Sequence, residues 1–105
     1  MGIISKREIA NITTTPWGYY EVLTKGDGYK VKFLVVFPGK RTSLQYHTKR
    51  EEWITNLDIG YTIHFPKYTE HRLEEGRYIE VQLGECEESD IVRLDDDYGR
   101  YGEII

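Results

Sequence analysis

The sequence predicts an all-β protein, built as a sandwich or barrel of short strands. Segments rich in β-branched and aromatic residues recur along its 105 residues, and turn signals rich in Gly, Pro, Asn and Asp separate them. The clearest segment, residues 29–37, alternates so that one face carries an apolar set: Tyr29, Val31, Phe33, Val35 and Phe37. No amphipathic helical segment of real length interrupts this pattern, which favours the all-β class.

The first half of the chain is expected to form an arm and four strands. Residues 1–12 carry mixed charge and form either a short strand or a loose arm, and residues 13–16 are expected to break the chain. Residues 26–28 (Gly-Asp-Gly) are typical of a hairpin turn, and residues 38–39 (Pro-Gly) of a strand end. The four strands are predicted at residues 18–23, 29–37, 42–47 and 51–55.

The second half is expected to continue as strands and polar loops. Residues 56–60 connect two strands, Pro66 stops the next one, and residues 75–76 (Glu-Gly) form a turn. The carboxylates at positions 85, 87, 88, 90 and 95–97 are predicted to lie in solvated loops. The strands of this half are predicted at residues 61–65, 71–74, 77–83 and 91–94.

Length, charge and cysteine content indicate one soluble domain, residues 1–105, with one modest core. The net charge is −4 and basic residues are interleaved with acidic ones, which argues against a nucleic-acid partner. No apolar run is long enough to span a membrane, and the N-terminus lacks the apolar segment of a secretory signal. Cys86, the single cysteine, fits a reducing compartment, so we expect a cytoplasmic protein.

Two histidine stretches carry the candidate chemistry. In a strand, Gln45 and His47 point to the same side, and Glu51 or Glu52 follows after a polar turn at residues 48–50. His71 comes five residues after Pro66 in the second stretch. Gln, His, Glu and a distant His form a plausible mixed nitrogen and oxygen site for a divalent metal ion. The alternative is that both histidines are ordinary polar strand residues.

These stretches resemble the two sequence motifs of the cupins. In the first cupin motif a Gly precedes two His that are separated by one residue, and a Glu follows them. Here Gly39 precedes Gln45, His47 and a Glu. In the second motif a Pro and a Gly precede one His; here Pro66 precedes His71, with Tyr68 in place of the Gly. The resemblance implies a small double-stranded β-helix, or jelly roll.

Within the cupins, the chain resembles the C-terminal domain of type II phosphomannose isomerases, which often follows a mannose-1-phosphate guanylyltransferase domain. Gln in place of the first His, preceded by Ser-Leu, carries this resemblance, as do residues 16–23, 28–32 and 90–100. It runs from about residue 14 to residue 100. The sequence has no Gly-rich phosphate loop, so we expect an isomerase-like module without the nucleotidyltransferase domain.

The resemblance implies a site for metal and sugar phosphate. The implied metal ligands are Gln45, His47, Glu52 and His71. Glu52 is preferred to Glu51 because Arg50 gives the Arg-x-Glu order of the family. Zinc is the first choice of metal, with manganese, nickel or iron as alternatives. Lys32 and Arg100 are assigned to the sugar phosphate, whereas His64, outside both motifs, is expected to be structural or superficial.

One departure from the family affects both assembly and activity. The hairpin that usually separates the two motifs is shortened here to residues 53–60, so two strands of the barrel should be missing. The resulting open edge predicts a homodimer. The implied activity is metal-dependent isomerisation of a sugar phosphate, as in mannose-6-phosphate isomerase. The alternatives are a non-catalytic module that binds metal and sugar, or a cupin enzyme acting on nucleotide-linked sugars.

Overall fold

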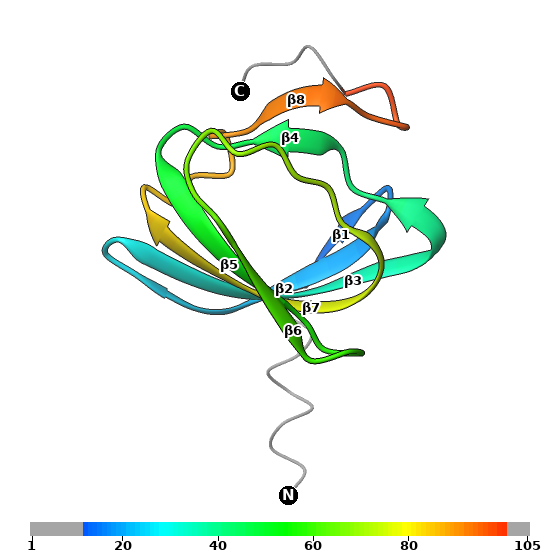
Figure 1. Cartoon of the computed structure of the whole chain (residues 1–105), viewed down its shortest axis with the longest axis horizontal. Coiled ribbons are helices and arrows are strands. Elements are labelled where there is room, and N and C mark those ends of the chain that lie inside the picture. Colours follow the sequence, from blue (N-terminus) through cyan, green and yellow to red (C-terminus); the bar gives the residue numbers. More distant parts are fainter. Residues whose placement is uncertain (1–11, 101–105) are drawn as a thin grey trace, which may run out of the picture.

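The computed structural model describes residues 12–100, which form two antiparallel sheets (Figure 1). The larger sheet has six strands in the order β1-β2-β3-β7-β5-β6, and the smaller sheet pairs β4 with β8. In Figure 1 the smaller sheet lies across the hollow side of the larger one. The strands are β1 (Ile12–Thr15), β2 (Gly18–Gly26), β3 (Tyr29–Arg41), β4 (Leu44–Tyr46), β5 (Arg50–Asn56), β6 (Tyr61–Phe65), β7 (Glu74–Gly84) and β8 (Val92–Asp95).

The predicted all-β class is confirmed, since residues 12–100 contain strands and turns and no helix. In this described part of the chain, no helix has the length and apolarity needed to cross a membrane. A tight turn at residues 57–60 joins β5 directly to β6, in keeping with the shortened hairpin. As a consequence, β6 pairs only with β5 and forms one edge of the larger sheet.

Two predictions, a strand end at residues 38–39 and a turn at residues 75–76, are wrong, because the strands continue through both places with irregular pairing. β3 does not end at residues 38–39; its pairing with β7 shifts register between Val36 and Arg41, and Gly39 takes a φ of 75° within the bulge. Similarly, residues 75–76 lie inside β7, where Gly76 pairs with Val36. A bulge bends a strand without ending it, and Gly and Pro in the sequence indicate a bulge and a turn equally well.

The N-terminal break predicted at residues 13–16 is also wrong. Ile12–Thr15 forms β1, which pairs with β2 around a turn that contains Pro16. The backbone N–H of Gly18 donates to Thr15 Oγ1 at 3.0 Å, which closes this turn. Residues 1–11 of the predicted arm lie outside the described residues.

The hydrophobic core lies between the two sheets and is small. Its buried members come from several elements: Trp17, Leu34, Val36, Ile54, Leu73 and Tyr78. The inner face of the larger sheet also buries polar side chains, among them Lys32, Glu52, Glu80 and Gln82. The alternating apolar set predicted for residues 29–37 therefore faces outward, because Lys32, Leu34 and Val36 occupy the inner face of β3.

Candidate metal centre

Three elements bring His47, Glu52 and His71 together. His47 follows β4, Glu52 lies on the inner face of β5, and His71 precedes β7. An isolated bridge connects Gln45 to His71, in which each backbone N–H donates to the other residue's carbonyl oxygen at 3.0 and 2.8 Å. This bridge fixes the second histidine stretch beside the first, so residues 24 positions apart in sequence reach one site.

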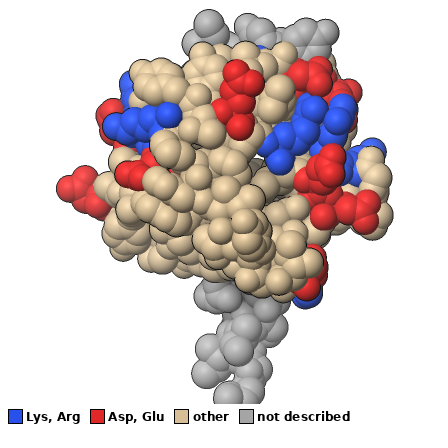
Figure 2. Space-filling view, viewed as in Figure 1, with Lys and Arg blue, Asp and Glu red and all other residues tan. Residues whose placement is uncertain are grey.

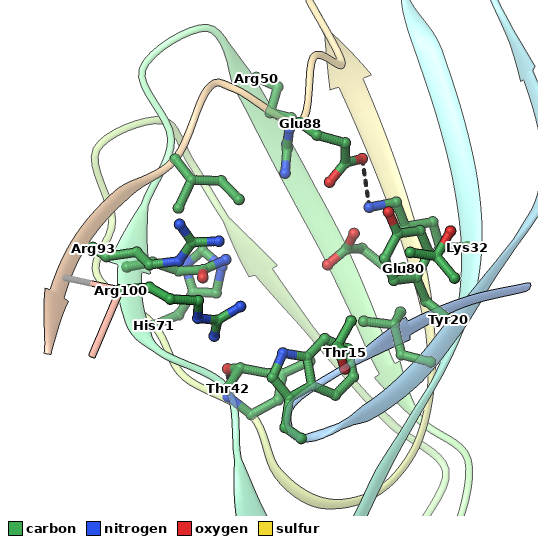
Figure 3. Close-up of a pocket in the computed structure, with 16 residues that line it drawn as sticks. Thr15, Tyr20, Lys32, Thr42, Arg50, His71, Glu80, Glu88, Arg93 and Arg100 are labelled. Carbon is green, nitrogen blue, oxygen red and sulfur yellow. Dashed lines mark hydrogen bonds and ion pairs between the residues drawn. The ribbon is translucent and has the colours of Figure 1, made fainter. Parts of the chain in front are cut away.

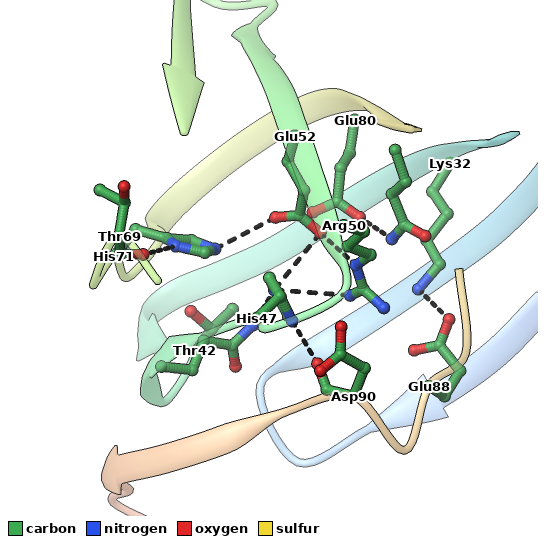
Figure 4. Close-up of polar contacts among 12 residues, drawn as sticks. Lys32, Thr42, His47, Arg50, Glu52, Thr69, His71, Glu80, Glu88 and Asp90 are labelled. Atoms are coloured by element: carbon green, nitrogen blue, oxygen red, sulfur yellow. Dashed lines mark hydrogen bonds and ion pairs between the residues drawn. The ribbon is translucent and has the colours of Figure 1, made fainter. Parts of the chain in front are cut away.

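The polar ends of these side chains converge on one point (Figure 4). His47 Nε2 lies 3.3 Å from Glu52 Oε2, and His71 Nε2 lies 3.1 Å from Glu52 Oε1. One potential ligand atom from each of the three residues falls within 4.8 Å of the others, and all three residues are buried. Two imidazole nitrogens and a carboxylate match the ligand set of zinc and of other first-row divalent ions. The group could therefore hold a metal ion.

The backbone sets the tautomer of both histidines. His47 Nδ1 lies 2.6 Å from the carbonyl oxygen of Asp90, and His71 Nδ1 lies 2.9 Å from that of Thr69. Since carbonyl oxygens only accept hydrogen bonds, both Nδ1 atoms are donors, and in a neutral ring each Nε2 keeps its lone pair. The lone pair of His47 lies near Glu52 and also 3.4 Å from Arg50 Nη2, which can donate to it. The lone pair of His71 faces Glu52 Oε1, and a proton or a metal ion can bridge these two atoms.

Electrostatics maintain the charge of the central carboxylate. Burial raises the pKa of Glu52, but its contacts with His47 and His71 and the nearby Arg50 charge outweigh burial, so this pKa lies well below its usual range. For His71, burial lowers the pKa, and the Glu52 carboxylate more than compensates, so the pKa of His71 is raised. Without metal, the contact with Glu52 thus favours the protonated form of His71.

Gln45, the fourth predicted ligand, lies beside the site with its nitrogen turned inward. Its Nε2 is 3.4 Å from His47 Nε2, while its Oε1 accepts a hydrogen bond of 2.5 Å from Ser43 Oγ. Rotation of the amide by half a turn would exchange the two atoms and present the oxygen to a metal ion. The assignment of all four residues as ligands stays a prediction.

Two charged residues position the histidine and the carboxylate. Arg50 is 3 % exposed; its Nε donates to Glu52 Oε2 at 2.9 Å, and its Nη1 donates to the carbonyl oxygen of Glu87 at 2.8 Å. The Asp90 side chain accepts hydrogen bonds from the backbone N–H groups of Thr48 and Lys49 at 3.0 and 2.8 Å. Asp90 thereby fixes the turn that carries His47.

A cavity of about 240 Å³ opens next to this group, between the two sheets (Figure 3). Its wall includes His71 and Gln45 from the candidate metal group and the aromatic rings of Trp17 and Tyr20. Charged side chains supply much of the remaining wall: Lys32, Arg50, Glu80, Glu88, Arg93 and Arg100. The excess of cations over carboxylates suits a small anionic ligand.

The two predicted substrate residues both line this cavity, and each is already in an ion pair. Lys32 Nζ lies 2.6 Å from Glu88 Oε2 and 4.2 Å from the centre of the Tyr20 ring. Arg100 binds Asp96 through two nitrogens, at 2.7 and 3.1 Å. An incoming anion would have to share these cations with Glu88 and Asp96.

Two other predicted residues lie elsewhere. Glu51, the alternative ligand, points away from the site and contacts His64 at 2.7 Å. His64 is stacked on Trp53 with ring centres 4.1 Å apart and lies on the surface, which is one of the two expected placements.

Sequence reasoning missed one acidic residue of the cavity wall, Glu80, and two buried acidic residues near the cavity, Asp90 and Asp96. Asp90 and Asp96 are buried, so the expectation that the carboxylates of residues 85–97 lie in solvated loops is wrong for both. Glu80 is likewise buried; its Oε1 accepts a hydrogen bond of 2.5 Å from Gln82 Nε2. Burial and the Glu52 charge raise the pKa of Glu80 despite the opposing effect of Lys32. The sequence did carry a signal for the burial of Glu80. Tyr78, Glu80 and Gln82 lie on the same face of one strand, and Tyr78 belongs to the core, so this face points inward.

The chain is similar to several known proteins. Residues 5–63 match the family described as mannose-6-phosphate isomerase C-terminal. A mannose-1-phosphate guanylyltransferase of Escherichia coli is 34% identical over 106 aligned residues, which cover 81% of this chain and 22% of the relative. The alginate biosynthesis protein AlgA of Pseudomonas aeruginosa is 36% identical, over 84% of this chain and 23% of the relative. The chain thus spans about a fifth of the length of these curated relatives.

A solved structure supports the fold. The crystal structure of a protein from Planctomyces limnophilus superposes with a TM-score of 0.65. The match covers 81% of this chain and 90% of the other, at 14% sequence identity. At this identity the likeness concerns the fold alone, and it agrees with a small cupin-like β-sandwich.

Proposed function

Because this chain belongs to the family of mannose-6-phosphate isomerase C-terminal domains, we propose that it isomerises a sugar phosphate with the help of a divalent metal ion. Mannose 6-phosphate is the first substrate to test. The observation that carries the proposal is the pair of Nε2 atoms, from His47 and His71, that face the two oxygens of Glu52 beside a cation-rich cavity.

The residues present fit a metal ion. His47, Glu52 and His71 would hold it, with Gln45 as a fourth ligand after rotation of its amide. A bound ion supplies polarisation of the sugar carbonyl and stabilisation of the enediol oxygen. Zinc remains the first candidate, because two imidazoles and a carboxylate suit it well.

The cations of the cavity would bind the phosphate. Lys32 is 4 % exposed and Arg100 lies across the cavity from it, so both can contact one small anion. Arginine offers a planar fork for phosphate oxygens, and a buried lysine adds a point charge. In this arrangement Glu88 gives up its contact with Lys32 when the anion enters.

Proton transfer between C1 and C2 of the sugar needs a group that can hold a proton beside the bound substrate. Glu80 lines the cavity, and its raised pKa favours the protonated form. Glu51 is excluded from this role because it lies on the opposite face of β5. We therefore assign the proton-carrying role to Glu80.

A second function, binding of metal and sugar without turnover, is favoured by one observation. The smaller sheet contributes only β4 and β8 within residues 12–100, so the cavity lacks part of the wall that would exclude water. In that case the protein would retain affinity for the sugar phosphate and show no conversion.

One assay separates the two functions. Purified protein, loaded with zinc, manganese or nickel in turn, is mixed with mannose 6-phosphate, and fructose 6-phosphate is measured with a coupled enzyme. The proposal predicts turnover that stops in chelator and returns with metal. Ligand affinity by calorimetry without any turnover would overturn the isomerase function and support the binding module.

The phosphorylated substrate and the free thiol of Cys86 both support a cytoplasmic location.

A further inference from the structure

A second cavity lies at the end of the larger sheet where β2 turns into β3, apart from the candidate metal centre. Its volume is about 670 Å³, against about 240 Å³ for the first cavity, which places it in the size range of sites for small organic ligands. Four stretches of chain form its wall: residues 25–30, 49, 67 and 84–87. None of the described residues lines both cavities, so the second cavity is a separate site.

Lysines supply the cationic groups of the second cavity. Two come from the hairpin of β2 and β3, and two lie next to β5 and β6: Lys25, Lys30, Lys49 and Lys67. All except Lys30 are exposed, so their ammonium groups can turn toward a ligand. Figure 2 shows that the basic side chains of the visible side gather mainly in two groups on the upper half of the molecule, each beside acidic ones. An ammonium group binds phosphate as a point charge.

An aromatic ring in the same wall is held by a glycine. A Cβ atom on Gly26 would lie 2.8 Å from Cζ and from Oη of Tyr29, so a larger residue at this position would displace the ring. The φ of Gly26 is not in the left-handed region, so the contact with the ring is what requires glycine here. Tyr29 lines the cavity and is 38% exposed, which leaves its ring available for stacking.

Carboxylates complete the wall and narrow the class of ligand. Asp27, Glu85 and Glu87 stand against the four lysines, so the excess of positive charge is too small to select a simple phosphate ion. Carboxylates accept hydrogen bonds from hydroxyl and amino groups. A ligand that suits all three kinds of side chain therefore carries phosphate, hydroxyl or amino donors, and a flat ring.

We propose that the second cavity binds a nucleotide, with its phosphates on the lysines, its base on the Tyr29 ring and its ribose hydroxyls on the carboxylates. Bases of every kind stack on aromatic side chains, because each base has a π-face. Acidic side chains are also the usual partners of ribose hydroxyls. The site goes beyond the proposed isomerisation, which uses the first cavity alone.

One carboxylate oxygen links the two cavities. Glu88 Oε2 lies 3.1 Å from Lys30 Nζ, on the side of the second cavity, and 2.6 Å from Lys32 Nζ in the first (Figure 3). A phosphate that draws Lys30 away leaves Glu88 to Lys32 alone, which strengthens its competition with an anion in the first cavity. A bound nucleotide should thus weaken anion binding there, and the effect is reciprocal. This link rests on the proposed function, whereas the nucleotide site does not.

Nuclear magnetic resonance of the metal-free, ¹⁵N-labelled full chain tests the site. The probes are adenosine diphosphate, guanosine diphosphate, pyrophosphate and adenosine, each titrated at constant ionic strength. We expect the two nucleotides to give saturable shifts of the amide signals of residues 25–30 and 84–87, with a dissociation constant of about 1 mM or lower. Pyrophosphate and adenosine should bind more weakly, because each lacks part of the recognised ligand.

Matched variants separate the lysines from the ring, with folding checked by circular dichroism. The double variant Lys49→Gln with Lys67→Gln should raise the dissociation constants of nucleotide and pyrophosphate about fivefold or more, because charge-assisted contacts to phosphate are lost. Tyr29→Ser should raise the dissociation constant of the nucleotides about fivefold and leave that of pyrophosphate unchanged, because only the base stacks. Lys40→Gln and Tyr61→Ser are the controls, since both residues are exposed and neither lines the second cavity.

Three results would overturn the proposal. The first is a lack of saturable shifts at residues 25–30 and 84–87 with nucleotide up to about 10 mM. The second is an equal loss of affinity in Lys40→Gln and in the double lysine variant, which would indicate attraction to surface charge in general. The third is equal affinity for nucleotide and pyrophosphate that Tyr29→Ser leaves unchanged, which would reduce the cavity to a phosphate site.

The single cysteine gives a readout that needs no variant. Cys86 lines the second cavity and carries a free thiol. A nucleotide bound there should slow the reaction of this thiol with a chromogenic disulfide reagent several-fold, whereas mannose 6-phosphate should not. Equal reaction rates with and without saturating nucleotide would contradict the assigned position of the ligand.

Calorimetry tests the link between the cavities. Saturating nucleotide should weaken the binding of mannose 6-phosphate to the metal-free chain several-fold, and the double lysine variant should lose this effect at the same nucleotide concentration. An equal weakening in the double variant would mean that the nucleotide competes directly in the first cavity, which would contradict the link. A chain that binds no mannose 6-phosphate at all would refute the proposed function, and the amide shifts would still decide whether the second cavity binds nucleotide.

Discussion

The Nε2 atom of His71 lies 3.1 Å from Oε1 of Glu52, a buried oxygen that has no other hydrogen-bond partner among residues 12–100. The opposite ring nitrogen of His71 donates to the carbonyl of Thr69, so Nε2 alone can respond to the carboxylate. A proton or a metal ion can complete this contact. Proton and metal therefore compete for the site, and several measurable consequences follow from that competition.

The first concerns the pKa of His71 in metal-free protein. Burial lowers this pKa and the Glu52 carboxylate raises it by more, so the Glu52→Gln change should bring the pKa of His71 below its usual 6.5. NMR titration of the ring proton in chelator measures it. Glu51→Gln is the control, since Glu51 lies on the other face of β5 and should leave the value raised. A pKa of His71 that is the same in both variants would contradict the assigned contact.

The second concerns stability against pH in chelator. The folded-state pKa of His71 is raised, so its stabilisation is fully present below pH 6.5 and is lost as the pH rises through the folded-state pKa. The depressed pKa of Glu52 has the opposite effect on stability. Its contribution is present at neutral pH and is lost only in strong acid, as the pH falls through the folded-state pKa. Metal-free protein should thus unfold at lower urea concentration at about pH 8.5 than at about pH 6. Metal-loaded protein should show the reverse trend, because metal binding requires deprotonated ligands.

Anion affinity should be limited by Glu88. Its carboxylate lies 2.6 Å from Lys32 and 3.1 Å from Lys30, so it competes with an anion for the same ammonium groups. Glu88→Gln should strengthen binding of inorganic phosphate or mannose 6-phosphate several-fold in calorimetry at constant ionic strength. Glu85→Gln, in the same loop but outside the cavity, serves as the control. Weaker binding in Glu88→Gln would mean that Glu88 organises the site instead of blocking it.

Asp90 should act as a positioning residue for His47. Asp90→Ala leaves the N–H groups of Thr48 and Lys49 without their acceptor and should cost about 1–3 kcal/mol of unfolding free energy. It should also weaken metal affinity about tenfold in a chelator competition, since groups that orient ligands have effects of that size. Ser89→Ala, an exposed neighbour, should change neither quantity. Loss of stability with unchanged metal affinity would limit Asp90 to a structural role.

The sequence predicts the strands of this fold better than its bends. Residues 61–65 form β6 as predicted, because Gly60 and Pro66 punctuate it on both sides. Gly and Pro also predict breaks at residues 38–39 and 75–76, and there the prediction fails. The two places lie opposite each other on β3 and β7, which remain paired on both sides of an irregularity. Pairing across strands decides between a turn and a bulge, and it depends on residues distant in the sequence.

The candidate site was predictable where a motif carried it. His47, Glu52 and His71 meet as the family resemblance implies. Glu80 and Asp90 have no motif of their own, and their roles depend on burial and on partners distant in the sequence. The alternation of residues 29–37 indicated one apolar face of β3, but the side of the sheet that faces the cavity became evident only from the buried partners of Lys32, Leu34 and Val36.

The most direct measurement is the metal content of the purified, untagged protein by elemental analysis, for the unmodified chain and for three histidine variants. The account predicts about one divalent ion per chain, lost in His47→Ala and in His71→Ala. It should be retained in His64→Ala, whose ring lies on the outer surface against Trp53. Metal that persists in His47→Ala and His71→Ala, or no metal in a folded unmodified chain after exposure to zinc, manganese and nickel, would contradict the proposed centre.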